Sequence, residues 1–177
     1  MVRRTPTSLV AIDHFSRAVM AVVPLEGPNA GWVVDALEEA FAKHGAPTHL
    51  ISDQEGVFIS DVFRDLLIGW DVKQRFGAVG KHGSIAVTER AIWTLKYEWL
   101  KRVPAIRGLD HLAELLGDFV LWYNDYRGHA TLGGALPAVI YRGEQSSKPE
   151  KSAKVLPSTI ERRFFADTQI TAYRLAA

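Results

Sequence analysis

Two carboxylates, Asp53 and Glu89, lie where an α/β protein gathers its reactive groups. Asp53 follows a short apolar strand predicted at 48–51 and precedes the glycine-containing loop 54–56. Ligands and active sites of α/β folds collect at the carboxyl ends of strands. Glu89 falls in the first turns of a helix predicted after the glycine-rich loop 77–83, and 35 residues separate it from Asp53. The two residues therefore predict an acidic site.

Each of these acids also has a purely structural interpretation. Asp53 could simply end its strand, and Glu89 could simply favour the N-terminus of its helix. On that helix Lys96 is seven residues after Glu89 and shares its face. A solvated surface lysine is the simpler explanation for Lys96.

Basic side chains are concentrated in the middle of the chain, although the net charge of the whole is only +1. Residues 73–107 contain eight lysines and arginines, and only Glu89 and Glu98 oppose them. A local positive field of this kind suits a phosphate backbone. The alternative is a solvated helix face.

Composition excludes several classes of protein. The 177 residues, of which 47% are hydrophobic and 23% charged, are typical of a globular protein and favour a single domain. The chain contains no cysteine, which excludes a disulfide scaffold, thiol catalysis and cysteine-containing zinc sites. We find no apolar run of membrane-spanning length and no secretion signal, so we expect no membrane association and a cytoplasmic location.

Strand and helix patterns alternate along the chain. Apolar runs at 9–12 and 19–25 predict a β-hairpin, and further strands are expected at 48–51 and 72–76. Helical spacing predicts helices over about 29–45, 60–70, from 84 onward, 109–126 and 137–141, and residues 159–175 favour one or two short strands. We expect an α/β domain with a mixed sheet over residues 1–144, then a linker and short extension over 145–177.

Four segments of the chain resemble the integrase catalytic core of DDE transposases and retroviral-type integrases. They are VAIDHFSR at 10–17, ISDQEGVF at 51–58, GKHGSIAVTERAIWTLK at 80–96 and WYNDYRGHATLGGALP at 122–137. In the second segment the glycine, Gly56, comes one residue later than in the family's pattern. The spacing between Asp53 and Glu89 matches the family's own, and the combination of segments is far more specific than any one of them.

The resemblance implies a ribonuclease H-like fold and phosphoryl transfer on DNA, namely cleavage at 3′ ends and strand joining during transposition. It implies two Mg²⁺ or Mn²⁺ ions, which Asp and Glu oxygens suit as hard ligands. Asp53 and Glu89 are then the catalytic, metal-binding carboxylates. Lys96 holds a phosphate near the site, and Lys81 and His82 contact the DNA backbone. DNA ends and further copies of the chain are the implied partners.

The family uses three carboxylates, and the first lies on a strand before the segment that matches 9–17. Residues 1–8 contain no acid, so we expect an N-terminally truncated core without the first catalytic Asp. Asp13 matches a turn position instead, where it hydrogen-bonds Ser16 and Arg17. Loss of the family's first strand is expected to leave unpaired backbone groups on the strands at 9–12 and 48–51.

The sequence is consistent with two alternative functions. The first is a DDE transposase core whose activity is impaired by the missing Asp. The second is a non-catalytic DNA-binding or oligomerising remnant of such an enzyme. In and next to the segment at 122–137, we expect Leu121, Trp122 and Tyr123 to pack in the hydrophobic core. We expect Asn124, Arg127 and His129 to fix the end of their helix.

Overall fold

The computed structural model describes residues 7–25, 27, 29–77, 85–144 and 160–175. This part of the chain divides into two compact units. The first unit holds the residues up to Ala11 and Met20–Ala91, and the second holds Ile12–Val19 and the residues from Ile92 onward. Lys81, His82 and residues 145–159 of the predicted linker and extension lie outside the described residues.

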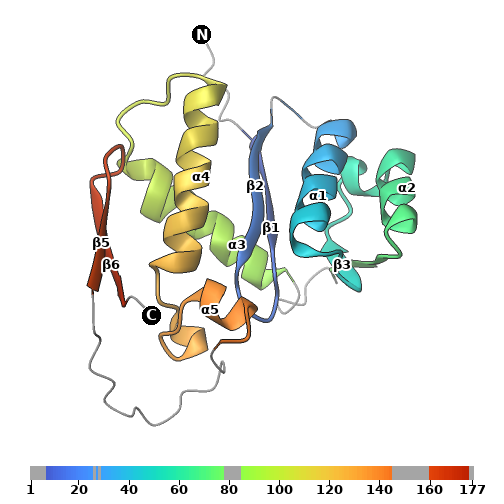
Figure 1. The fold of residues 1–177 in the computed structure, drawn as a ribbon. Helices are drawn as coiled ribbons and strands as arrows, with labels where there is room; N and C mark the ends of the chain where they lie inside the picture. Colours follow the sequence, from blue (N-terminus) through green and yellow to red (C-terminus); the bar gives the residue numbers. More distant parts are fainter. Residues whose placement is uncertain (1–6, 26, 28, 78–84, 145–159, 176–177) are drawn as a thin grey trace. The chain divides into compact units, whose positions relative to one another are not determined.

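The strands of the first unit form two separate sheets (Figure 1). One sheet pairs β1 (Thr7–Ile12) with β2 (Val19–Leu25). The two strands form a hairpin, because the segment that connects them is too short for a parallel crossover. The other is β3 (His49–Ser52) with β4 (Lys73–Phe76), which run parallel with Ser52 opposite Phe76. Among the residues described, each of these strands pairs with one neighbour, so the α/β fold has small two-stranded sheets in this unit.

Helices of the first unit begin and end where the sequence predicts. The Asn29 side chain accepts a hydrogen bond from Gly31 N–H and caps α1 (Ala30–His44), and Gly45 ends the helix with φ of 85°. A 3₁₀ turn, η1 (Gly56–Ile59), leads into α2 (Asp61–Gly69). Phe63, Leu66 and Leu67 form the buried face of α2, whereas half of the Val62 surface is exposed (51%).

Both sheets of the first unit, α1 and α2 contribute to one hydrophobic core. Its buried members are Leu9, Leu25, Val33, Leu37, Phe41, Phe63, Leu66, Leu67 and Val72. Leu50 of β3 packs against this cluster. The core thus fixes the strand that carries Asp53 at its end.

The predicted long helix after residue 84 changes its geometry midway. It begins as α3 (Ala86–Trp93), continues as a π-helical turn, η2 (Thr94–Trp99), and closes as a 3₁₀ turn, η3 (Leu100–Arg102). A π turn pairs residues five apart rather than four, so the apolar positions after Trp93 no longer follow ordinary helical spacing. Thr94, Leu95 and Trp99 are buried in the second unit. The remaining elements of this unit are α4 (Leu109–Asp125), η4 (Ala130–Leu132), α5 (Pro137–Tyr141), β5 (Ile160–Phe165) and β6 (Ile170–Leu175).

Trp99 lies at the centre of the second unit's core. Its indole stacks on Trp122 with ring centroids 5.2 Å apart, and the edges of Phe119 and Phe165 meet it at 6.0 and 5.2 Å. Trp99 Nε1–H donates to the carbonyl oxygen of Leu115 at 2.8 Å, which satisfies its one polar group. Leu121 is only partly buried, whereas Trp122 and Tyr123 are in the core as expected.

No helix in the parts of the chain that the structure describes combines the length and hydropathy needed to cross a membrane.

Candidate active site

Asp53 follows directly on β3, and hydrogen bonds hold both the end of this strand and the Asp53 carboxylate. The Ser52 carbonyl accepts a hydrogen bond from Gly77 N–H at 2.9 Å, which extends the β3–β4 pairing to the end of the strand. Asp53 Oδ1 accepts from Glu55 N–H at 3.1 Å. The carboxylate is exposed, so its charge is available to a ligand.

Gln74 of β4 is a supporting residue that sequence reasoning missed. Its Nε2 donates to Ser52 Oγ at 3.1 Å and to the Phe58 carbonyl at 2.8 Å. These bonds tie the end of β3 to the far side of the loop that follows Asp53. A single glutamine 22 residues from Ser52 carries no sequence signal, because only the strand pairing brings the two together.

Glu89 lies in the first turn of α3, where a negative charge is favourable to the helix dipole. Its N–H donates to the Ile85 carbonyl at 2.9 Å, and its side chain is exposed. Asp53 and Glu89 belong to the same compact unit. Lys96 lies in η2 of the second unit and is exposed, and the π turn replaces the regular helix on which its predicted face depended.

The donor atoms at Asp53 and Glu89 are chemically suited to Mg²⁺ or Mn²⁺, since both are exposed carboxylates with hard oxygens. Within the described ranges, however, no group of three or more histidine, cysteine, aspartate or glutamate side chains is arranged to hold a metal ion.

Asp13 has the structural role expected of it. Its Oδ2 accepts hydrogen bonds from Ser16 N–H at 2.7 Å and from Ser16 Oγ–H at 2.6 Å. Its carbonyl accepts from Arg17 N–H at 2.9 Å, and Arg17 takes the left-handed backbone conformation with φ of 64°. The carboxylate is thus engaged in forming the turn between β1 and β2.

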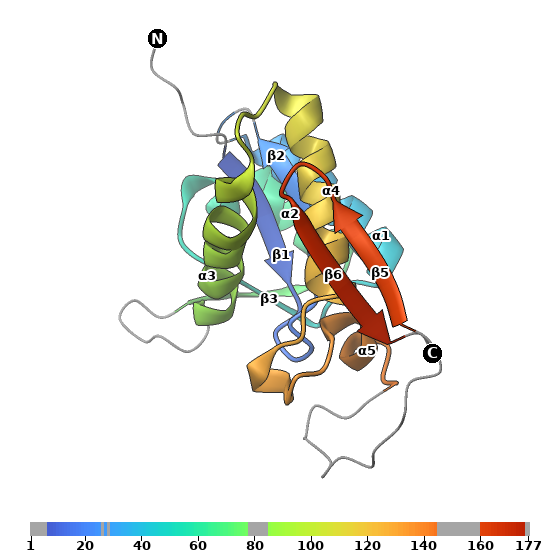
Figure 2. The ribbon, with the colours of Figure 1, turned by 90° about the vertical axis from the view of Figure 1, so that its left-hand side faces the viewer.

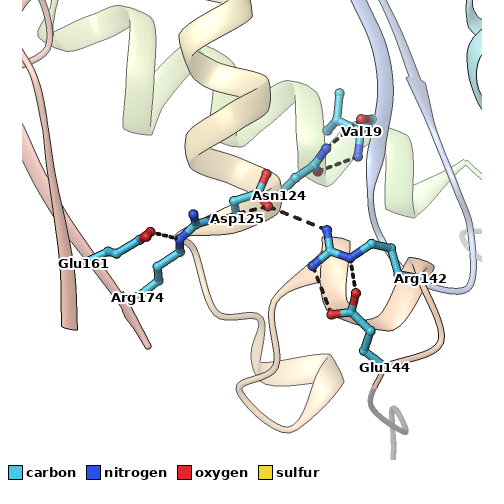
Figure 3. A network of polar contacts seen from close by, with 7 residues as sticks. All are labelled: Val19, Asn124, Asp125, Arg142, Glu144, Glu161 and Arg174. Atoms are coloured by element: carbon cyan, nitrogen blue, oxygen red, sulfur yellow. Dashed lines mark hydrogen bonds and ion pairs between the residues drawn. The ribbon is translucent and has the colours of Figure 1, made fainter. Parts of the chain in front are cut away.

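Asn124, near the end of α4, pairs with the backbone of Val19 as a neighbouring strand would. Its Oδ1 accepts from Val19 N–H and its Nδ2 donates to the Val19 carbonyl, both at 2.8 Å (Figure 3). Val19 is buried, so no water replaces these bonds if the amide is removed. The residue holds the first residue of β2 rather than contacting a substrate.

Replacing Asn124 by Ala is expected to lower the free energy of unfolding by about 2 kcal/mol or more, because it leaves two buried backbone groups unsatisfied. Urea denaturation followed by circular dichroism measures the change. Glu114→Ala, an exposed position of the same helix, is the matched control and is expected to stay within about 0.5 kcal/mol of the wild type. Equal stability of Asn124→Ala and wild type would contradict this role.

Arg127 joins the end of α4 to η2. Its guanidinium forms bidentate hydrogen bonds with the Glu98 carboxylate at 3.0 and 3.1 Å and lies 5.7 Å from the ring centroids of both Trp122 and Tyr123. The His129 ring meets Tyr123 edge-on, with centroids 4.6 Å apart. Arg127 and His129 thus support the helix end and its loop, as expected, and the Glu98 partner, 29 residues away, was not predicted.

Asp125 connects α4 to both α5 and the C-terminal strands (Figure 3). Its Oδ1 lies 3.9 Å from Arg142 Nη1 and 3.7 Å from Arg174 Nη1. Hydrogen bonds to Glu144 and Glu161 raise the pKa of Arg142 and of Arg174, respectively, and the bond from Arg142 lowers the pKa of Glu144. These groups are largely solvated, so each pair contributes little to stability.

Comparison with known proteins agrees with this description. One model of the integrase core domain family matches residues 3–82, and a second matches residues 70–137. A curated Caenorhabditis elegans protein, "Uncharacterized protein K02A2.6", is 28% identical over 118 residues, which are 66% of this chain and 9% of that protein. The chain thus spans about a tenth of the length of this curated relative.

Three solved structures of viral integrases are similar in fold. The HTLV-2 integrase catalytic core domain in complex with magnesium (trimeric form) is 19% identical, with a TM-score of 0.63 over 80% of this chain and 88% of that one. The BIV integrase catalytic core domain is also 19% identical, with a TM-score of 0.62 over 78% and 92%. The simian T-cell lymphotropic virus intasome in complex with the PP2A regulatory subunit B56 gamma is 16% identical, with a TM-score of 0.65 over 96% and 64%. The two integrase core domain models together match residues 3–137, and the α/β fold is similar to that of viral integrase catalytic cores, in agreement with the four motif segments.

Proposed function

We propose that this chain is the catalytic core of a DDE transposase or integrase, which cleaves DNA and joins DNA strands in transposition, with activity impaired by an incomplete set of carboxylates. The observation that carries the proposal is the placement of Asp53 and Glu89. One follows β3, the other opens α3, both are exposed, and both belong to the first unit.

In this proposal Asp53 and Glu89 bind Mg²⁺ or Mn²⁺. When bound, divalent ions polarise the phosphodiester, activate the attacking oxygen and stabilise the leaving oxygen. The residues of the chain supply positions and charges. The Ser52–Gln74 contact and the Glu55 N–H bond fix the Asp53 backbone and one of its oxygens. No side-chain nucleophile is required, because water or a DNA 3′-hydroxyl attacks.

Contacts to DNA form the second part of the proposal. The exposed Lys96 holds a phosphate, and Lys81 and His82 contact the backbone from the glycine-rich segment. The transposase acts as a homo-multimer on transposon ends and target DNA in the cytoplasm. Residues 1–144 form the catalytic domain, and 145–177 form a linker and extension.

The test is a strand-joining assay with the purified chain, a labelled DNA duplex and plasmid DNA as target. We expect a low yield of labelled plasmid that requires Mn²⁺ or Mg²⁺ and disappears with EDTA. A folded chain that binds the duplex but gives no product with either metal would contradict catalysis by this chain.

A second candidate function is a non-catalytic DNA-binding or oligomerising remnant of a transposase. Its support is that the described residues contain no cluster of three potential metal ligands. Under this alternative the chain binds DNA and joins multimers of intact transposase, and adding it to an active enzyme lowers the yield of strand joining.

A further inference from the structure

The β5–β6 hairpin presents two faces of different character. Its antiparallel register places Arg162 opposite Tyr173 and Phe164 opposite Thr171. Because successive side chains of a strand point to opposite faces, these four residues and Ile160 share one face. The other face carries Glu161, Arg163, Phe165, Ala172 and Arg174.

The inner face of the hairpin is fixed to the rest of the second unit. Phe165 is buried against Trp99 and Tyr126, and Ala172 is also buried. Arg174 pairs with Asp125, and Asp167 in the turn lies 3.5 Å from His111 of α4. The orientation of the hairpin on α4 is thus determined by packing, and Figure 2 looks onto the face turned away from that helix.

The outer face exposes large apolar side chains. Ile160, Phe164 and Tyr173 retain 61%, 51% and 59% of their surface. Two aromatic rings and an isoleucine exposed on a two-stranded ribbon are a liability to a protein unless something covers them. This face is therefore a candidate interaction surface.

Charge indicates what kind of partner covers it. The inner arginines are paired, Arg163 with Asp118 and Arg174 with Glu161 and Asp125. Arg162, on the outer face, pairs with no carboxylate in the described part of the chain, and that face carries no acid of its own. The preceding residues 145–159 add three lysines and one glutamate. An acidic partner is favoured over an apolar protein surface.

We propose that the outer face of the β5–β6 hairpin binds single-stranded DNA, with bases stacked on Phe164 and Tyr173 and a phosphate held by Arg162. Aromatic rings beside an arginine are the side chains that stack on unpaired bases, whose faces a duplex hides. Phe164 and Tyr173 are diagonal neighbours across the ribbon, roughly 7 Å apart by sheet geometry, so one strand reaches both. The choice of DNA rests on the proposed function.

The test is a fluorescence anisotropy titration of labelled oligo(dT) in EDTA, where no metal-dependent chemistry takes place. Phe164→Thr/Tyr173→Thr removes both rings and keeps strand-forming residues. We expect it to bind at least about tenfold more weakly than wild type. Arg162→Gln is expected to reduce the slope of log affinity against log salt by about 0.7. Phe15→Thr, which removes a ring that is 68% exposed in the β1–β2 turn, is the matched control and is expected to bind as wild type.

Two further measurements keep this inference separate from the proposed function. Phe164→Trp keeps a stacking surface and is expected to retain affinity, which distinguishes stacking from damage to the hairpin. The titration of the wild type in EDTA is expected to show binding of oligo(dT) whether or not strand joining is ever detected. Unchanged affinity in the double threonine variant would overturn the inference. A second outcome would also overturn the inference: the wild type is a dimer, and the double threonine variant is a monomer with unchanged affinity for oligo(dT). The outer face would then bind a second copy of the chain.

Discussion

Replacing Trp99 by Ala is expected to be the most destabilising single substitution in the second unit, costing about 3–5 kcal/mol. The indole is fully buried, contacts three other aromatic rings and satisfies its N–H on Leu115. Its removal opens a cavity that rigid neighbouring rings cannot fill. Because typical domains are stable by only about 5–15 kcal/mol, we expect a large fall in the denaturation midpoint.

The measurement is thermal and urea unfolding followed by circular dichroism. Trp93→Ala removes the same side chain six residues earlier, where the indole is 44% exposed, and is expected to cost much less. Trp99→Phe keeps a ring but loses the bond to Leu115, so an intermediate cost is expected. Equal costs for Trp93→Ala and Trp99→Ala would contradict the central position of Trp99.

Replacing Asp53 by Asn or Glu89 by Gln is expected to lower metal-dependent strand joining by roughly a hundredfold or more. Each change keeps the shape of the side chain and removes the charge that binds a divalent ion, and stabilisation of the transition state by such ions amounts to several kcal/mol. With the low activity that we propose, the product is expected to fall below detection.

Asp35→Asn and Glu38→Gln are the controls for this experiment. Both lie on α1 in the first unit, both are exposed, and both remove one negative charge, as the site variants do. We expect them to join strands as wild type does. Strand joining that survives in Asp53→Asn or Glu89→Gln would show that the product does not depend on these two carboxylates.

Local patterns in the sequence predicted the elements that local interactions determine. Asn29 and Gly45 delimit α1, and the apolar runs define β1 and β2, because caps and turns act within a few residues. The family-like segments predicted the integrase core fold, which the comparisons confirm. The site residues named from these segments remain predictions.

Features that depend on pairing between distant residues could not be predicted. Gln74 reaches Ser52 only once β3 and β4 are aligned, and Arg127 meets Glu98 only after α4 has packed on η2. The π turn at Thr94–Trp99 has backbone hydrogen bonds between residues five apart instead of four. The spacing of apolar side chains in the sequence does not reveal this difference. The separation of the strands into two-stranded sheets likewise reflects pairing rather than strand propensity.

The central claim, that Asp53 and Glu89 together bind a divalent ion, is tested most directly by calorimetric titration of the folded chain with Mn²⁺. We predict saturable binding in the wild type and a loss of affinity in Asp53→Asn and in Glu89→Gln. The loss of Mn²⁺ affinity should be larger than roughly tenfold to hundredfold. A loss of that smaller size is typical when the altered residue only hydrogen-bonds a metal ligand. Glu38→Gln should bind as wild type. No binding by the folded wild type, or binding that both site variants retain, would contradict the account.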